Sequence, residues 1–285
     1  MHALWMIGAS LAFAAMGACI KLAGEAGSPQ GQIIFYRGFL SLLAVWAYMR
    51  WAGIPVVSRH WRIHLRRSLT SLVSLIAFFA AIRMLPLGTA VTLLYVSPLL
   101  LAVLLPLVHR EWPGGWLLVA LLSGLLGVTL LLRPTAQGAY WAGGAIGVLA
   151  AVLTALSALN MRALGQLKEP SWRSVFYFTL VIVIATLPWY LASSPLSIDR
   201  KAAALMAGVA LFATAGQVML TKAYEYRHTL LVAMLGYSQV IFTSLIGMIL
   251  WHDILGWTSW LGMLMIIAAG AGAMMISQRN THPLL

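Results

Sequence analysis

Charged residues are scarce in this sequence. Asp, Glu, Lys and Arg together make up 8% of the 285 residues, whereas a typical soluble domain has about 25%. Acidic residues are the rarest, with 6 Asp and Glu against 18 Lys and Arg, and 62% of the chain is hydrophobic. So few polar side chains cannot cover a water-exposed surface, which excludes a soluble globular domain.

Other missing features exclude further classes of protein. Cys19 is the single cysteine, so no disulfide scaffold can form within the chain. The sequence has no glycine-rich phosphate loop and no spacing of His, Cys or carboxylates typical of a metal site, so neither a cofactor nor a metal is expected. No His is paired with a buried Ser or Asp, which argues against an intramembrane enzyme. The cations that give the net charge of +12 are dispersed and not clustered, which argues against nucleic acid as a partner.

Long apolar runs dominate the sequence instead. About 20 apolar residues span a bilayer as a helix, and Gly, Pro, Arg and Trp clusters divide the chain into runs of this length. The runs are continuous and do not alternate with polar residues, which favours helices over a β-barrel. They predict an all-α integral membrane protein with ten transmembrane helices near 3–22, 30–51, 66–84, 88–109, 115–133, 142–162, 172–192, 202–224, 228–250 and 257–276.

The distribution of cations predicts the orientation of these spans. If the N-terminus is cytoplasmic, five cations fall outside: Lys21, Arg83, Arg133, Arg200 and Lys201. Twelve fall inside: Arg50, Arg59, Arg62, Arg66, Arg67, Arg110, Arg162, Lys168, Arg173, Lys222, Arg227 and Arg279. This bias obeys the positive-inside rule. We therefore predict a multi-pass protein of the cytoplasmic (inner) membrane with both termini in the cytoplasm.

An internal repeat divides the chain into two halves. A shift of 142 residues brings Ala81 onto Ala223, Tyr95 onto Tyr237 and Glu111 onto Asp253, and a shift of 141 aligns Pro29 with Pro170. We expect one five-helix repeat over residues 1–137 and a second over 138–285. Because five is an odd number, the second repeat inserts upside down relative to the first, as in many secondary transporters.

In these features the sequence resembles the drug/metabolite transporter superfamily, in its ten-helix EamA-type branch. The resemblance covers nearly the whole chain. It is carried by Phe35-Tyr36-Arg37, by Ala81 through Leu85-Pro86-Leu87-Gly88-Thr89-Ala90, by Tyr95-Val96-Ser97-Pro98, by Glu111, Gly124 and Gly127, and by Ala223, Tyr237 and Asp253. The resemblance implies transport of small organic solutes through a cavity lined by the first, third, fourth, sixth, eighth and ninth spans.

One position departs from the family pattern. Such proteins usually have a proline in the span of each half that precedes the acidic residue. Pro98 fills this position in the first half, whereas its counterpart in the second half is Val240. Because a proline bends a helix, the sequence leaves open whether the two halves bend alike.

Arg37 is the one charge predicted to lie well inside a span. An ionisable group there costs about 2.5–3.5 kcal/mol on insertion scales, so it is a candidate for function. It could bind a carboxylate or phosphate of the substrate or act at a gate. Alternatively, its guanidinium extends outward to the interface.

Neutral polar and aromatic residues on the implied cavity helices complete the candidate site. The two repeat-related tyrosines have the strongest claim, because symmetry predicts that they face each other near the midplane. The candidate substrate-binding residues are Trp5, Arg37, Tyr95, Ser97, Asn160, Gln217, Tyr237 and Gln239. Some of the Ser, Thr and Asn residues could instead hydrogen-bond between helices. Lys222 and Glu225, near the end of the eighth span, are an ion pair or a cytoplasmic gate.

These features together predict a secondary transporter that moves a small organic metabolite across the membrane by alternating access. The alternative is a flippase for a lipid-linked or anionic amphiphile, because the arginine-rich connection after the second span could bind lipid headgroups. Small-residue stretches at Gly143–Gly147 and Ala268–Ala273 serve helix packing, and the second could form a homodimer contact. The sequence is compatible with a monomer or a homodimer.

Overall fold

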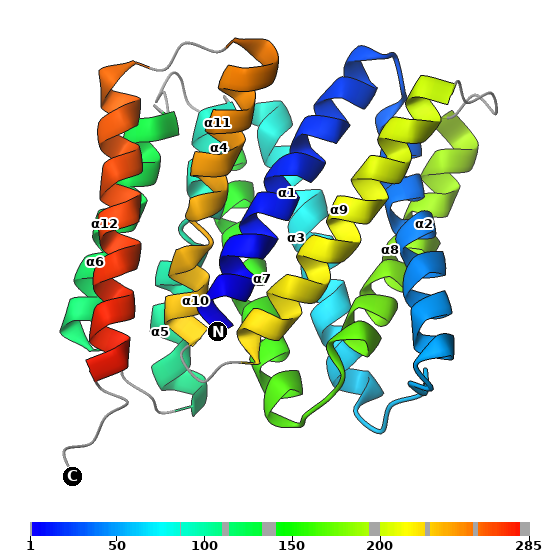
Figure 1. The fold of residues 1–285 in the computed structure, drawn as a ribbon, viewed down its shortest axis with the longest axis horizontal. Helices are drawn as coiled ribbons and strands as arrows, with labels where there is room; N and C mark the ends of the chain where they lie inside the picture. Colours follow the sequence, from blue (N-terminus) through cyan, green and yellow to red (C-terminus); the bar gives the residue numbers. More distant parts are fainter. Residues whose placement is uncertain are drawn as a thin grey trace.

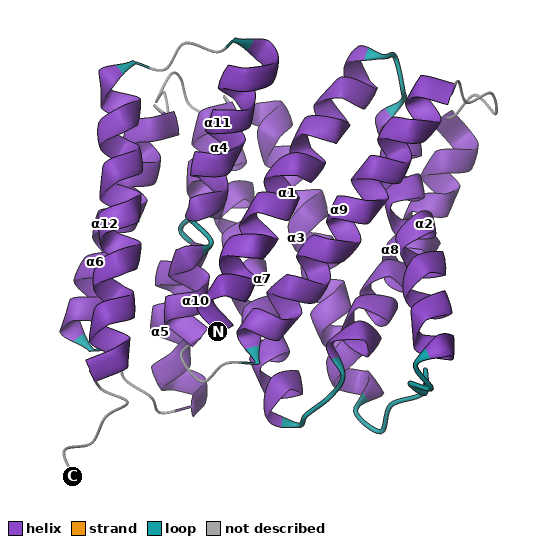
Figure 2. Cartoon of the chain, viewed as in Figure 1, coloured by secondary structure: helices purple, strands orange, loops and turns teal. Residues whose placement is uncertain are grey.

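The computed structural model describes residues 2–85, 87–109, 114–132, 141–193, 200–225, 229–252 and 256–279. Every regular element in these ranges is an α-helix (Figure 2). The helices are α1 His2–Glu25, α2 Gln30–Trp51, α3 Trp61–Met84, α4 Leu87–Leu94, α5 Ser97–His109, α6 Gly115–Leu132, α7 Trp141–Gln166, α8 Ser171–Ser193, α9 Arg200–Tyr224, α10 Thr229–Leu235, α11 Ser238–Trp251 and α12 Trp257–Arg279. The expected all-α membrane fold is therefore confirmed.

Most of these helices are long and apolar enough to cross a membrane. Within the described ranges eight segments meet this criterion, and a shorter apolar helix covers Trp257–Ala273. The 24-residue helix α3 begins at Trp61, five residues before the expected span, and adds polar turns at its start. The count of ten spans stays a prediction. Pro86, Glu111, Asp253 and the expected boundary between residues 137 and 138 lie outside the described residues.

Two of the expected spans are broken near their middle. The expected span over 88–109 consists of α4 and α5, with Tyr95 and Val96 between them. The cause is Pro98, which has no N–H to donate and whose ring collides with the carbonyl four residues earlier, at Leu94, where α4 ends. The span over 228–250 is also broken, between α10 and α11, at Gly236 and Tyr237. The two halves therefore bend alike, although Val240 replaces the proline.

A glycine accounts for the second break. Gly236 N–H donates to the Ala233 carbonyl at 3.1 Å, which tightens the end of α10. A Cβ at this position would lie 2.9 Å from the Ala233 oxygen and 2.9 Å from Met6 Cε of α1. The absence of a side chain thus permits both the turn and the close approach of α1.

The turn between α1 and α2 recurs between α7 and α8 with the same hydrogen bonds. Ser28 N–H donates to Ala23 and Glu169 N–H donates to Leu164, each at 3.0 Å, and a proline follows in both turns. These pairs are 141 residues apart, which is the sequence offset of the repeat. The first turn lies at the top of the view and the second at the bottom (Figure 1), so equivalent elements run in opposite directions.

The recurring turn predicts a stabilising substitution. Gly27 and Lys168 occupy equivalent positions and have left-handed backbones, with φ of 82° and 54°. A residue with a Cβ is disfavoured there by roughly 1–2 kcal/mol. Lys168→Gly is therefore expected to raise the unfolding temperature of the detergent-purified protein by about 3 °C. The matched reverse change, Gly27→Lys, is expected to lower it; equal effects of the two substitutions would contradict this assignment.

The main helix contacts join residues of the first half to residues of the second. α1 packs along α9, and α3 along α7, in equivalent pairs; α2 packs on α8 and α6 on α12 (Figure 1). The first turn of α1 and the last turn of α12 lie at one end of the bundle, together with residues 52–60 and 167–170. We call this the proximal end, and the opposite end, with the α1–α2 turn, the distal end.

Candidate functional site

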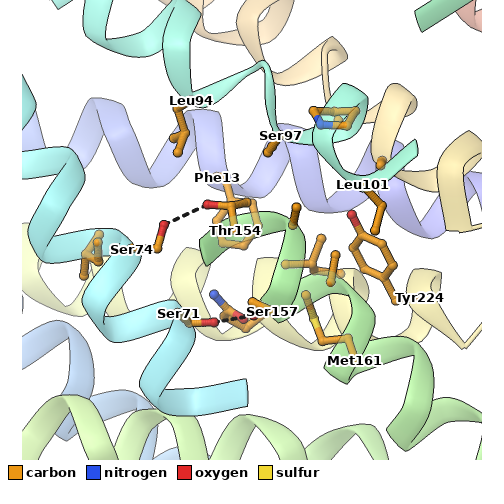
Figure 3. Close-up of a pocket in the computed structure, with 18 of the residues that line it drawn as sticks. Phe13, Ser71, Ser74, Leu94, Ser97, Leu101, Thr154, Ser157, Met161 and Tyr224 are labelled. Atoms are coloured by element: carbon orange, nitrogen blue, oxygen red, sulfur yellow. Dashed lines mark hydrogen bonds between the residues drawn. The ribbon is translucent and has the colours of Figure 1, made fainter. Parts of the chain in front are cut away.

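A cavity of about 300 Å³ lies inside the bundle, where the two broken helices approach each other. Its walls come from α1, α2, α3, α7, α8 and α9 and from both sides of each break. Most of the lining is apolar or aromatic, including Phe13, Leu101 and Tyr224 (Figure 3). Small-molecule sites have this composition, with a few polar groups that fix orientation.

Paired hydroxyl groups form the polar wall between α3 and α7. Ser71 Oγ lies 2.6 Å from Ser157 Oγ, and Ser74 Oγ lies 2.8 Å from Thr154 Oγ1 (Figure 3). Ser74 also donates to the Ala150 carbonyl at 2.8 Å. These bonds join the two halves beside the cavity and satisfy hydroxyls that would otherwise be costly inside a membrane.

The repeat-related tyrosines meet at the two helix breaks. The rings of Tyr95 and Tyr237 contact each other edge to face, with centroids 5.8 Å apart. Tyr95 lines the cavity, whereas Tyr237 lies behind it, only 1% exposed and packed against Gly124 of α6. The two tyrosines face each other, as the repeat predicts, and their contact brings the two breaks together.

Two arginines line the cavity. Arg37 of α2 lies on the wall, as does Arg67 of α3. Arg67 Nη2 donates to Gln217 Oε1 at 2.9 Å, and the guanidinium lies over the Phe178 ring at 4.5 Å. Among the described ion pairs, none involves either arginine. The cavity therefore holds two positive side chains that have no carboxylate partner in the described residues.

The expected site residues divide into two groups. Five of them line the cavity: Arg37, Tyr95, Ser97, Gln217 and Gln239. The other three lie elsewhere: Tyr237 is behind the cavity, Asn160 Nδ2 donates to the Leu156 carbonyl of its own helix at 3.0 Å, and Trp5 is 36% exposed. Thr154 and Ser157 lie on the wall and bond to α3.

The expected gate residues Lys222 and Glu225 have different partners. Lys222 Nζ lies over the Trp5 ring, 4.6 Å from its centroid. Glu225 accepts a hydrogen bond from Ser171 Oγ of α8. No ion pair joins Lys222 to Glu225 in the described part of the chain, although they are one helical turn apart.

Sequence reasoning missed Arg67, Ser71 and Ser74 as site residues. The sequence predicts Arg67 at the edge of a cytoplasmic connection, because it predicts that the third span begins at residue 66. In the structure α3 begins at Trp61 and Arg67 is almost two turns inside it. The spacing of 67, 71 and 74 places the three side chains on one helical face, and this pattern could have identified them.

A second polar cluster, also missed, surrounds Glu169 at the proximal end. Its carboxylate accepts hydrogen bonds from Ser58 at 2.6 Å, from His60 at 2.9 Å and from Arg173 at 2.5 Å, and lies 3.3 Å from His64 Nε2. Burial raises the pKa of the Glu169 carboxyl, but these hydrogen bonds outweigh that effect and lower the pKa to about 2. We call Ser58, His60, His64, Glu169 and Arg173 the Glu169 cluster. It ties the α2–α3 connection to the α7–α8 turn and thus joins the two halves.

Aromatic rings join the halves at the distal end. Tyr190 of α8 stacks on Phe35 of α2, with centroids 4.4 Å apart, and its hydroxyl lies 3.3 Å from that of Tyr36. Tyr36 and Tyr177 are repeat equivalents, and the ring of Tyr177 stacks on that of His64 in the Glu169 cluster, with centroids 4.8 Å apart. Equivalent tyrosines thus lie at opposite ends of the cavity, in a charged setting at one end and an aromatic setting at the other.

Comparisons with known proteins agree with this architecture. The model of the EamA-like transporter family matches residues 1–133 and 141–276. The pseudopaline exporter CntI of Pseudomonas aeruginosa strain UCBPP-PA14 is 26% identical over 246 residues, covering 86% of each chain. A riboflavin transporter of Rhizobium johnstonii is 27% identical over 187 residues, covering 64% of this chain and 61% of that protein. A solved crystal structure shares the fold, with a TM-score of 0.84 and 16% identity over 99% of both chains.

Proposed function

This chain belongs to the EamA-like transporter family, within the drug/metabolite transporter superfamily, and on that premise we propose that it is a secondary carrier that moves a small organic solute by alternating access. The family is one of membrane transporters and not of enzymes. The named relatives differ in their solutes, since one is an exporter of pseudopaline and the other a transporter of riboflavin. Relatedness therefore supports transport of small molecules but does not select the solute.

The position of the cavity is the observation that carries this proposal. It lies between the two halves, at the point where both spans are broken. Broken helices at the centre of inverted repeats are the usual site of solute binding in secondary transporters. The Tyr95–Tyr237 contact joins the two breaks, so movement of one half relative to the other would reshape the cavity.

The unequal contacts at the two ends support alternating access. At the proximal end a buried carboxylate holds the halves together through the Glu169 cluster. At the distal end the corresponding contact is made by aromatic rings and one pair of hydroxyls. We propose that these two contacts open in turn, so that the cavity communicates with one side of the membrane at a time.

The proposed setting is the inner membrane with both termini in the cytoplasm. The proximal end carries the first turn of α1, the last turn of α12 and the basic connection after α2 (Figure 1). By the positive-inside rule this end would face the cytoplasm. The Glu169 cluster would then be the cytoplasmic closure.

A thiol-accessibility experiment tests both parts of this proposal. Cys19 is first replaced by serine, and Ser71→Cys then places a single thiol on the cavity wall. In the proposed cycle a membrane-impermeant maleimide labels this thiol in both preparations. The reagent reaches it from the outer face of the membrane in spheroplasts and from the cytoplasmic face in inverted vesicles. Labelling from one side only, or from neither side, contradicts alternating access. Arg66→Cys, on the exposed surface of the same helix, is the control and should be labelled only from the cytoplasmic side.

A further inference from the structure

We propose that the transported solute is an organic anion whose carboxylate or phosphate group binds Arg67, with Arg37 as a second positive charge beside it. This inference rests on the proposed carrier function and specifies the substrate class of the same cavity. It is carried by three observations: the hydrogen bonding of Arg67, the charge balance of the cavity walls and the apolar character of most of the remaining lining.

The guanidinium of Arg67 is held in place, but not all of its hydrogen-bond donors have an acceptor among the described residues. Arg67 is 1% exposed, its Nη2 donates to Gln217, and its guanidinium lies over the ring of Phe178. Nη2 also lies 3.7 Å from Met161 Sδ. Nε and Nη1 are buried, and no described residue accepts a hydrogen bond from them. Buried donors without acceptors are unfavourable. A ligand oxygen that accepts hydrogen bonds from them would therefore add substantially to the free energy of binding.

The charges of the cavity are also unbalanced. Arg37 adds a second positive side chain, and the described lining residues include no Asp or Glu. Each described acidic side chain has partners elsewhere: Glu25 accepts from Trp251, Glu225 accepts from Ser171, and Glu169 is held in its own cluster. Two cations in a low-dielectric interior require a counter-charge, and no described residue supplies one.

The rest of the cavity indicates the body of the solute. Most of the other lining side chains are apolar or aromatic, including Phe13, Leu101 and Tyr224 (Figure 3). Ser97 and Gln239, one beside each helix break, provide neutral hydrogen-bonding groups. The cavity of about 300 Å³ therefore fits a compact amphipathic anion, with the acidic group at Arg67 and an apolar or aromatic body toward the breaks.

Matched pairs of small molecules test this class with the purified full chain in detergent. 3-Phenylpropionate and phenyl phosphate carry the two proposed acidic groups, and 3-phenylpropanamide has the body of the first without its charge. Near saturation, at least one of the two anions is expected to raise the unfolding temperature by about 3 °C, whereas the amide leaves it unchanged. The anion that gives the larger rise identifies the preferred acidic group.

Variants link the response to Arg67. Arg67→Gln is expected to abolish the rise, while Arg66→Gln, which removes an exposed arginine of the same helix, keeps it. Because Arg67→Gln removes an uncompensated buried charge, we expect it to fold. Should it fail to do so, Arg37→Gln provides the second test and is expected to reduce the affinity for the anion at least tenfold.

The outcomes separate this inference from the proposed carrier function. An equal response to acid and amide, no response to either anion, or a response unchanged in both arginine variants overturns the anion site, whatever the thiol labelling shows. Conversely, an Arg67-dependent anion response with Ser71→Cys labelled from one side only would support the site and contradict alternating access.

Discussion

Replacing Gly262 with alanine is expected to remove most of the folded protein from the membrane. Gly262 of α12 faces Gly127 of α6, and the two backbones are in direct contact. A Cβ at 262 would lie 2.5 Å from the carbonyl oxygen of Gly127 and 2.9 Å from the amide nitrogen of Leu131. Because both obstacles are backbone atoms of a rigid helix, the strain cannot be relieved by rotating a side chain.

The expected loss of folding stability is large for the addition of one methyl group. Overpacking typically destabilises a protein by about 1–3 kcal/mol, and separating two helices over their length belongs at the upper end of that range. A loss of about 3 kcal/mol would lower the unfolding temperature by roughly 8 °C. Size-exclusion chromatography of a fluorescent fusion measures the folded yield, and thermal unfolding of the recovered fraction measures the shift.

A second glycine of the same helix provides the control. In the described part of the chain, no atom outside the adjoining residues and backbone of α12 itself lies within 4 Å of the ideal Cβ position of Gly272. Alanine favours helices over glycine by about 1 kcal/mol. Gly272→Ala should therefore leave the yield unchanged or increase it slightly. Equal losses from the two alanines would show that the α6–α12 contact does not determine stability.

Replacing Glu169 with glutamine is expected to weaken the proximal closure. The substitution keeps the size of the side chain but removes the charge that accepts hydrogen bonds from Arg173 and His60. Hydrogen bonds to charged groups contribute roughly 1.5–3 kcal/mol each, so we expect a loss of about 2 kcal/mol in the proximally closed state. Labelling of Ser71→Cys from the cytoplasmic side should then become at least tenfold faster.

The same carboxylate predicts a pH dependence of stability. The pKa of Glu169 in the folded protein is about 2, below its ordinary value of 4.5. The folded state therefore gains stability from the ionised group at pH values above about 4.5, and loses it as the pH falls from there toward 2. The difference in unfolding temperature between wild type and Glu169→Gln should shrink over this interval.

Glu25→Gln is the matched control for the Glu169 substitution. Glu25 is at the distal end, and the described structure gives its carboxylate one hydrogen bond, from Trp251 Nε1 at 2.8 Å. This change should leave cytoplasmic labelling of Ser71→Cys within about twofold of the parent. If Glu169→Gln also leaves it unchanged, the Glu169 cluster does not close the proximal end.

The helical spans were predictable because hydrophobicity and length dominate a membrane fold. The second helix begins and ends where the sequence predicts, at Gln30 and Trp51, and the repeat correctly anticipates the Tyr95–Tyr237 contact. The helix break at Gly236 is harder to predict from the sequence than the break at Pro98. It depends on the approach of Met6, a contact between residues far apart in the chain, whereas Pro98 carries the cause of its own break.

The candidate site was harder to predict than the fold. Arg37 was noticeable because its neighbours are apolar, whereas Arg67 has Arg66 beside it and resembles part of a topology signal. Only packing distinguishes the two neighbours, since Arg66 is exposed and Arg67 is buried. The role of Glu169 depends on four groups, three of which lie more than a hundred residues away, and local sequence does not contain that information.

The partners of α3 also have a consequence for biosynthesis. His64 and Arg67 are synthesised early, but Glu169 and Gln217, which bind them, follow 105 and 150 residues later. When α3 leaves the ribosome, its buried arginine has no acceptor, and leaving it in lipid would cost roughly 2.5–3.5 kcal/mol. The third helix is therefore expected to remain near the translocon or the headgroup region until α7–α9 arrive. The first half on its own should then be a poor substrate for membrane insertion and a ready target for quality-control proteases.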